Sequence, residues 1–153
     1  MGTKKKPLKP VPKRAADGPA VLAIDPGWTT GWAYMAPWDG VFTGTFGGDG
    51  VEYEAETRKL IKRFAPDQIV IERMPREMDQ RTGAITALIE NAVVAYGKGH
   101  SRIAPGEWKP VTNKHALPFE METQHEKDAF RMGMFYLYKC HFIPRPIDMD
   151  ELL

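Results

Sequence analysis

The chain has 153 residues, of which 21 are basic and 20 acidic, so a net charge of only +1 conceals an uneven distribution. Residues 1–20 carry six basic side chains and one acid, a net charge of +5, whereas the other 15 basic and 19 acidic residues give the remainder −4. The length suits one domain and excludes architectures with two large lobes. We therefore expect a basic arm attached to a mildly acidic body.

Hydrophobic residues make up 42% of the chain, which suffices for a packed core, but no apolar run is long enough to cross a membrane. No apolar stretch follows the charged N-terminus, so we expect no secretory signal either. Cys140 is the only cysteine, which excludes an internal disulfide and favours a reducing, cytoplasmic compartment. Any metal site must use carboxylates and the four histidines.

Residues 1–19 are rich in proline and basic side chains, so we expect a disordered arm that is either a solubilising tail or a tether to a polyanion. Residues 20–145 form the predicted domain, and 146–153 a C-terminal tail. The domain opens with three strand-like runs joined by short turns, which indicates an antiparallel meander. In chain order, the pattern predicts strands 20–25, 31–35 and 41–46, helix 51–64, strand 68–71, helix 79–96, strand 101–104, an irregular segment 105–122 and helix 124–139.

This order predicts an α/β fold with a five-stranded mixed sheet, the first three strands antiparallel, flanked by helices. The residues expected to face the core from the three helices are Tyr53, Leu60, Ile61 and Phe64; Ile85, Leu88, Ile89, Ala92 and Val93; and Phe130, Met134, Leu137 and Tyr138. The small residues of helix 79–96 allow the close approach of another element. That element is either a second copy of the chain or a neighbour within the monomer.

Three acidic residues stand out by their positions: Asp25 and Glu72 end apolar strands, and Asp128 lies near the start of the final helix. If the two strands are parallel neighbours, their ends meet at one sheet edge, where such sheets usually bind ligands. An oxygen-rich site of this kind suits Mg²⁺ or Mn²⁺. Each acid also has a structural explanation: Asp25 starts a turn, Glu72 has arginines near it, and Asp128 complements the helix dipole.

The final helix carries two further polar signals. His125 and Asp128 are three positions apart and can point the same way, so His125 is a candidate metal ligand or proton carrier. Thr123 to Glu126 fits a capping box, and we therefore interpret Glu126 as a helix cap rather than a catalyst.

Four segments in this order resemble RuvC-type Holliday junction resolvases, with a compactness similar to the phage branch. They are Val21-Leu22-Ala23-Ile24-Asp25-Pro26-Gly27 with Thr30-Gly31-Trp32-Ala33, Ile69-Val70-Ile71-Glu72, Ile103-Ala104-Pro105-Gly106-Glu107-Trp108-Lys109, and His125-Glu126-Lys127-Asp128-Ala129. The resemblance covers about residues 20–140. It implies the RNase H-like fold, a homodimer, and a site of Asp25, Glu72, His125 and Asp128 that holds two Mg²⁺ or Mn²⁺ ions. It also implies a role in DNA recombination and repair, as an endonuclease that makes paired cuts in four-way DNA junctions.

We expect DNA to be contacted mainly through its phosphates, because a junction is recognised by shape more than by sequence. The candidate contacts are Lys109 and Lys114, followed by Arg73, Arg76 and Arg81, although each could be an ordinary solvated charge. Many resolvases carry an aromatic residue shortly after the second acid, but the segment 74–78 has none. Trp28 lies in the catalytic loop, and we expect it to pack against the sheet rather than to stack on bases.

Three other functions compete with junction resolution. One is a nuclease of the same fold that cuts flaps, forks or RNA hybrids, and another is a non-catalytic DNA-binding domain. The third is an actin-like or sugar-kinase ATPase, because residues 24–31 also resemble its phosphate-binding hairpin. Such an ATPase needs two lobes around its nucleotide, which 153 residues cannot supply, so we expect no nucleotide cofactor.

Overall fold

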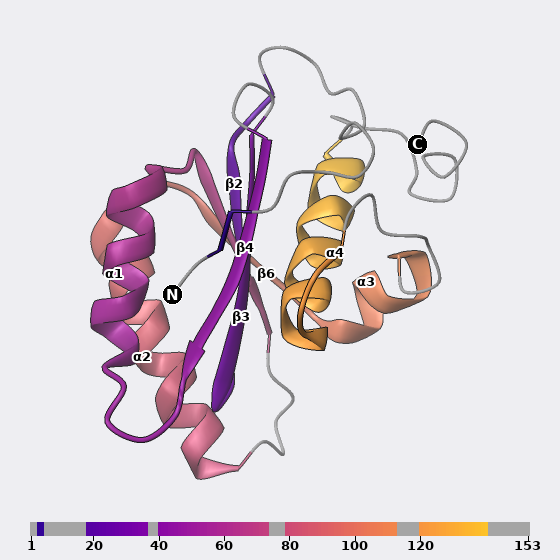
Figure 1. Ribbon diagram of the computed structural model, residues 1–153. Coiled ribbons are helices and arrows are strands. Elements are labelled where there is room, and N and C mark those ends of the chain that lie inside the picture. Colours follow the sequence, from indigo (N-terminus) through magenta and orange to yellow (C-terminus); the bar gives the residue numbers. More distant parts are fainter. Residues whose placement is uncertain (1–2, 5–17, 37–39, 74–78, 113–119, 141–153) are drawn as a thin grey trace.

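The computed structural model describes residues 3–4, 18–36, 40–73, 79–112 and 120–140 (Figure 1). The elements are β1 (Thr3–Lys4), β2 (Val21–Asp25), β3 (Thr29–Ala36), β4 (Gly40–Gly47), α1 (Tyr53–Phe64), β5 (Gln68–Glu72), α2 (Gln80–Tyr96), β6 (His100–Ile103), α3 (Pro105–Thr112) and α4 (Gln124–Lys139). The strands form one sheet in the order β1-β4-β3-β2-β5-β6.

The sheet is mixed, as predicted. Strands β2, β3 and β4 pair antiparallel, whereas β5 pairs parallel with both β2 and β6. Strand β1 is an addition to the five predicted strands, and it pairs antiparallel with Phe42 and Thr43 at the edge of β4. It lies inside the segment expected to be a disordered arm, most of which, like the tail 146–153, falls outside the described residues.

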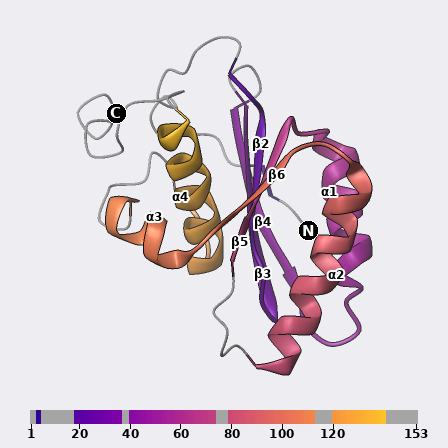
Figure 2. The same cartoon turned by 180° about the vertical axis from the view of Figure 1, so that it is seen from behind.

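Two helical layers cover the sheet: α1 and α2 lie over one face, and α3 and α4 over the other (Figures 1 and 2). Successive residues of a strand point to opposite faces, so each strand contributes to both cores. In β2, Leu22 and Ile24 join the α1 and α2 core, while Val21 and Ala23 join the α4 core. This alternation decides on which face the polar ends of the strands project.

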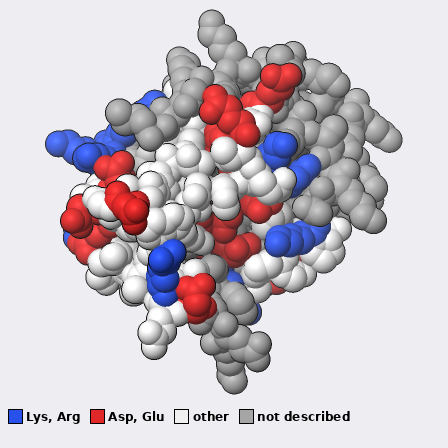
Figure 3. Space-filling view, turned by 60° about the horizontal axis from the view of Figure 1, so that its bottom comes forward, with Lys and Arg blue, Asp and Glu red and all other residues white. Residues whose placement is uncertain are grey.

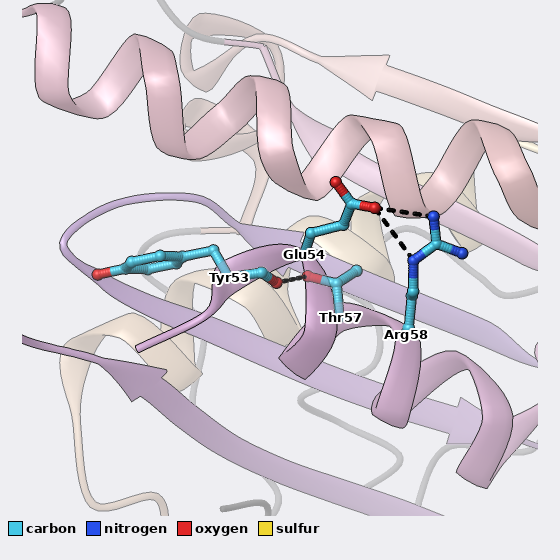
Figure 4. Close-up of polar contacts among 4 residues, drawn as sticks. All are labelled: Tyr53, Glu54, Thr57 and Arg58. Atoms are coloured by element: carbon cyan, nitrogen blue, oxygen red, sulfur yellow. Dashed lines mark hydrogen bonds and ion pairs between the residues drawn. The ribbon is translucent and has the colours of Figure 1, made fainter. Parts of the chain in front are cut away.

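Helix α1 begins at Tyr53, two residues later than expected, and it is held by contacts within its first turns (Figure 4). The Thr57 hydroxyl donates to the Tyr53 carbonyl at 2.8 Å, and the Arg58 guanidinium donates to the Glu54 carboxylate at 2.8 Å. Tyr53, Leu60 and Ile61 are buried, so the predicted apolar face is confirmed.

Helix α2 differs from its prediction at one residue. Ile85, Ile89, Ala92 and Val93 are buried, but Leu88 is 40% exposed. Each residue of a helix is rotated by about 100° from the one before, so a sheet that takes Ile85 and Ile89 leaves Leu88 at the margin of the buried stripe. The prediction that Leu88 faces the core was wrong.

The irregular segment expected over 105–122 contains helix α3 at its start. Proline suits a first helical position, because the N–H that it lacks has no partner there. The Glu107 carboxylate then accepts a hydrogen bond from the Ala104 N–H at 2.8 Å. The buried side chain of Trp108 also stabilises the helix, and it counteracts the low helix propensity of Gly106 and Pro110 within the same eight residues.

Helix α4 runs over Gln124–Lys139, as predicted, and the capping box of Thr123 and Glu126 is confirmed. Glu126 is buried, and its carboxylate also accepts a hydrogen bond from the Thr43 hydroxyl of β4 at 2.7 Å. Among the described residues, no helix has the length and apolar character needed to span a bilayer.

Candidate active site

The acids Asp25 and Glu72 lie side by side at the ends of β2 and β5. These strands are parallel with Ile24 opposite Ile71, so the next residue of each is an acid. Side chains two positions apart in a strand point to the same face of the sheet. Asp25 therefore points to the same face as Val21 and Ala23, and Glu72 to the same face as Val70, which is the face covered by α4. The predicted meeting of the two acids at one sheet edge therefore agrees with the topology.

Helix α4 brings His125 and Asp128 to the same edge, and Gly31 makes this approach possible. Gly31 pairs with Asp25 across β2 and β3, and a Cβ atom at Gly31 would overlap the backbone carbonyl of His125. The helix therefore starts directly over the strand position opposite Asp25. The His125 side chain is exposed, and that of Asp128 is half-buried.

The electrostatics of Asp25 show that three carboxyl groups are close. Its pKa is raised from 3.8 to about 8, first by burial, then by the Glu72 charge and a hydrogen bond with Glu72, and then by the Asp128 charge. The Lys109 ammonium acts in the opposite direction. Asp25, Glu72 and Asp128, from three separate elements, thus form one mutually repelling acidic cluster.

Trp108 of α3 is a member of this site that sequence reasoning missed. Its side chain is fully buried, and its indole N–H donates to Glu72 Oε2 at 2.9 Å. The Lys109 ammonium lies 5.5 Å from the centre of the same indole ring. The sequence signal was the place of Trp108 in Ile103–Lys109, one of the segments that carry the resemblance, but that resemblance gave Trp108 no role and residues 105–122 were expected to be irregular.

Asp128 has its own neighbours on α4. Its Oδ1 accepts a hydrogen bond from the Gln124 amide at 2.7 Å. Arg131 is near enough for its charge to interact with Asp128, although burial is the larger influence and lowers the arginine pKa. Both partners lie within four residues of Asp128, so α4 orients this acid locally.

The donor set suits a hard divalent cation, because carboxylate oxygens are its preferred protein ligands. The pKa of Asp25 is raised first by burial and then by repulsion from Glu72 and Asp128, and a cation would relieve that repulsion. In the arrangement of the described residues, no three His, Cys, Asp or Glu side chains are close enough together to hold a metal ion. The chemistry of the residues thus fits a metal, while a complete set of ligands would require side-chain rotation.

Both acidic and basic side chains lie around this edge. Figure 3 views the end of the molecule at which β2 and β5 finish, and it shows acidic side chains near the middle of that face and toward its rim, with separate lysines and arginines between them. Of the predicted DNA contacts, Lys109, Arg73 and Arg81 are exposed. Lys114 and Arg76 lie outside the described residues.

Trp28 does not pack against the sheet as we expected. Its side chain is 39% exposed, and the guanidinium of Arg81 lies 4.3 Å from the centre of its ring. Trp28 lies in the turn between β2 and β3, and the sequence alone did not indicate that its indole would stay exposed there.

Comparison with known proteins identifies the fold. No family model and no curated protein matches the sequence. Among solved structures, RuvC of Thermus thermophilus in complex with a Holliday junction substrate is 14% identical with a TM-score of 0.64, covering 80% of this chain and 94% of that one.

Two further structures share the architecture. The yeast mitochondrial Holliday junction resolvase Ydc2 is 13% identical with a TM-score of 0.57, covering 94% of this chain and 86% of that one. The fowlpox virus resolvase is 11% identical with a TM-score of 0.54, covering 78% and 99%. The chain therefore has the RNase H-like fold in the form that RuvC and other Holliday junction resolvases share.

Proposed function

We propose that the protein is a divalent-metal-dependent endonuclease that resolves four-way DNA junctions by paired strand incision. The observation that carries this proposal is the cluster of Asp25, Glu72 and Asp128 at one sheet edge, where burial first and then the two neighbouring acids raise the pKa of Asp25 to about 8. Bringing buried carboxyl groups together lowers the stability of the folded protein, so such a cluster is typical of a site that binds a cation or transfers a proton. The fold is one found in resolvases, which favours a DNA junction as the substrate.

Each acidic residue has a role in this proposal. Asp25, at the centre of the cluster, would help to hold both of two ions, Glu72 would help to hold one of them and Asp128 the other. His125, beside Gly31, would be a further ligand or would carry a proton. Divalent ions bound here would supply an acidified water and offset charge on the scissile phosphate. The expected products carry a 5′-phosphate and a 3′-hydroxyl.

Lys109, Arg73 and Arg81 contribute the positive charge that brings the DNA backbone to this edge. All three are exposed, and Lys109 is close enough to affect Asp25 electrostatically. Lys109 and Arg73 orient the phosphates without reading sequence, which agrees with recognition of a junction by its shape.

The protein acts as a homodimer in this proposal, because two opposed strands must be cut. Helix α2 is the proposed contact. Its outer side exposes uncharged residues that include Leu88, at 40%, and Val94, at 62%. An apolar surface exposed along a helix is typical of an interface.

The test uses Asp25→Asn on a synthetic four-way junction. We expect cleavage in Mg²⁺ or Mn²⁺ to fall by at least about a thousandfold, because the central ligand is lost, while junction binding remains measurable. Asp49→Asn, in the exposed turn after β4, is the control and should cleave normally. Undiminished cleavage by Asp25→Asn would contradict the assignment.

The same assay compares a four-way junction with a fork, a flap and a plain duplex. We expect the junction to be cut most rapidly, with symmetrical incisions on opposed strands. A preference for forks or flaps would replace junction resolution by cleavage of other branched DNA. Binding without cleavage of any substrate would indicate a non-catalytic DNA-binding domain.

A further inference from the structure

Trp28 is an aromatic residue that the hydrophobic core does not bury. It follows Asp25 by three positions, in the turn between β2 and β3. Its side chain is 39% exposed, although Trp32 and Trp108 are fully buried. Exposure of an indole ring forgoes the stabilisation that burial of its large apolar surface would give.

The backbone of Trp28 is nevertheless firmly held. The hydroxyl of Tyr53, at the start of α1, donates to the Trp28 carbonyl at 2.6 Å. Figure 4 shows the Tyr53 ring extending away from the start of its helix. On the other side, Gly47 at the end of β4 approaches so closely that a Cβ atom there would overlap the same carbonyl. The indole therefore projects from a fixed position.

Arg81 faces the ring of Trp28. Its guanidinium carbon lies 4.3 Å from the ring centre, a distance typical of a cation–π contact. Arg81 belongs to the first turn of α2, where its charge interacts with the N-cap residue Asp79, whose carboxylate accepts a hydrogen bond from Thr82 N–H at 2.7 Å. The pair is thus an exposed flat ring beside an exposed planar cation.

The position of the pair connects it to the acidic cluster. Trp28 follows the strand that ends in Asp25, and α2 is the next element after the strand that ends in Glu72. Both members therefore lie at the same end of the sheet as the two acids.

A ring and a guanidinium of this kind bind nucleobases through their flat faces. Within a duplex, both faces of each base are covered by its neighbours, so no face is available. A branch point is different, because bases there can leave the stack at a cost of only a few kcal/mol. The chemistry of the pair therefore suits DNA whose stacking is interrupted.

We propose that Trp28 and Arg81 form a stacking site for a nucleobase displaced at the branch point of the DNA. This inference rests on the proposed function. It assigns the opening of the junction to the turn after β2 and the first turn of α2.

The experiment places 2-aminopurine beside the base at the branch point of a four-way junction, so that its fluorescence rises when that neighbouring base leaves the stack to bind Trp28 and Arg81. The protein carries Asp25→Asn so that the DNA stays intact. We expect binding to increase the fluorescence, and Trp28→Ala to remove most of that increase and to weaken junction binding by about tenfold. Affinity for a plain duplex should not change.

Two further variants separate stacking from general effects. Trp28→Phe keeps an aromatic ring and should restore much of the signal. Arg81→Gln should lower it, whereas Arg58→Gln, on the exposed side of α1, should leave it unchanged. If Trp28→Ala does not fold, Trp28→Phe and Arg81→Gln still decide the question when the fluorescence is read at saturating protein, because a weaker general attraction for phosphates does not change the signal of fully bound DNA.

A full fluorescence increase and full affinity in Trp28→Ala and Arg81→Gln would overturn the inference. So would the absence of any increase when the Asp25→Asn protein binds. Both outcomes leave junction cleavage by the native protein intact. Failure of the proposed function would appear differently, as no preference of the native protein for the junction and no metal-dependent cleavage.

Discussion

Trp108 connects Glu72 to helix α3 through a buried hydrogen bond of 2.9 Å from the indole N–H. A carboxylate at the end of a strand can rotate freely unless a neighbour fixes it. Here the fully buried indole of Trp108 fixes the position of Glu72 Oε2, and the Glu72 carboxyl group also makes a hydrogen bond with Asp25. Such partners usually set the orientation of metal-binding carboxylates.

Trp108→Phe tests this role, because it removes the N–H while keeping an aromatic ring. We expect the affinity of the DNA-free protein for Mn²⁺, measured by calorimetry, to fall by roughly 10- to 100-fold, with a similar loss of cleavage. Trp32→Phe removes the same groups from the other core and should leave Mn²⁺ affinity unchanged. Equal effects of the two substitutions would indicate packing alone.

Asp25 predicts a pH dependence of stability in the metal-free protein. Its pKa is about 8 when folded and near 3.8 when exposed, so the folded protein keeps a proton that the unfolded chain releases. The stabilisation is complete below about pH 4 and is lost as the pH rises to about 8, on the order of 1.4 kcal/mol for each unit of pKa difference.

Urea unfolding of the native protein and Asp25→Asn, in a chelator at pH 5 to 8, measures this effect. We expect the variant to become progressively more stable than the native protein as the pH rises, because asparagine cannot acquire charge. The comparison cancels the opposite contributions of Glu54, Asp79 and Glu107, whose pKa values are lowered. A constant difference across this range would contradict the prediction.

At the scale of elements, the start of α4 determines whether the third acid reaches the first two. Two features hold it there. The buried Glu126 accepts hydrogen bonds from Thr43 of β4 and from the N–H and hydroxyl of Thr123, so the buried charge is well satisfied. Gly31 then allows the His125 backbone to contact β3 directly.

Gly31→Ala should push this helix start away from β3. The new Cβ atom would overlap the His125 carbonyl, so we expect a loss of about 1–3 kcal/mol in the free energy of unfolding, and a loss of cleavage larger than this instability explains. Gly106→Ala is the control, because its Cβ would meet nothing within 4 Å, and it should be neutral or slightly stabilising. Full cleavage by Gly31→Ala would show that the contact is dispensable.

At the scale of the whole molecule, the net charge of +1 is the sum of a positive N-terminal segment and a negative remainder. The −4 of residues 21–153 includes Asp25, Glu72 and Asp128. Two divalent ions, if both were bound, would bring this part to about neutral and leave the +5 of residues 1–20 uncompensated. In our proposal the loaded protein is therefore positive overall and suited to DNA.

The proposed dimer makes the final prediction. Val94→Lys places a charge on the exposed outer side of α2, and we expect it to shift the protein from a dimer to the 17.3 kDa monomer in sedimentation experiments, because an unpaired charge in an interface must lose its hydration. Ala55→Lys, at an exposed position of α1, should leave the native mass unchanged. A native protein that is already monomeric would contradict the α2 interface.

Much of the fold was predictable from local pattern. Apolar runs ending at turn signals predicted the mixed sheet. The acids at the ends of two such runs predicted that Asp25 and Glu72 would meet if those strands were parallel neighbours, and the pairing of β2 with β5 meets that condition. The capping box marked the start of α4 at the correct residue. These features follow from the alternation of strands and the unpaired groups of helix ends, which are properties of neighbouring residues.

Other features depended on which distant residues meet. The sequence by itself determined the succession of strands and helices from β2 to β6, the ends of α4 and the candidate acids. Only the tertiary structure decided that Trp108 is buried against Glu72, that Leu88 lies at the margin of the core, that Gly31 receives the start of α4 and that Trp28 is exposed beside Arg81. The reason is physical: the burial of a side chain depends on what covers it, and the covering residues are dozens of positions away in the chain.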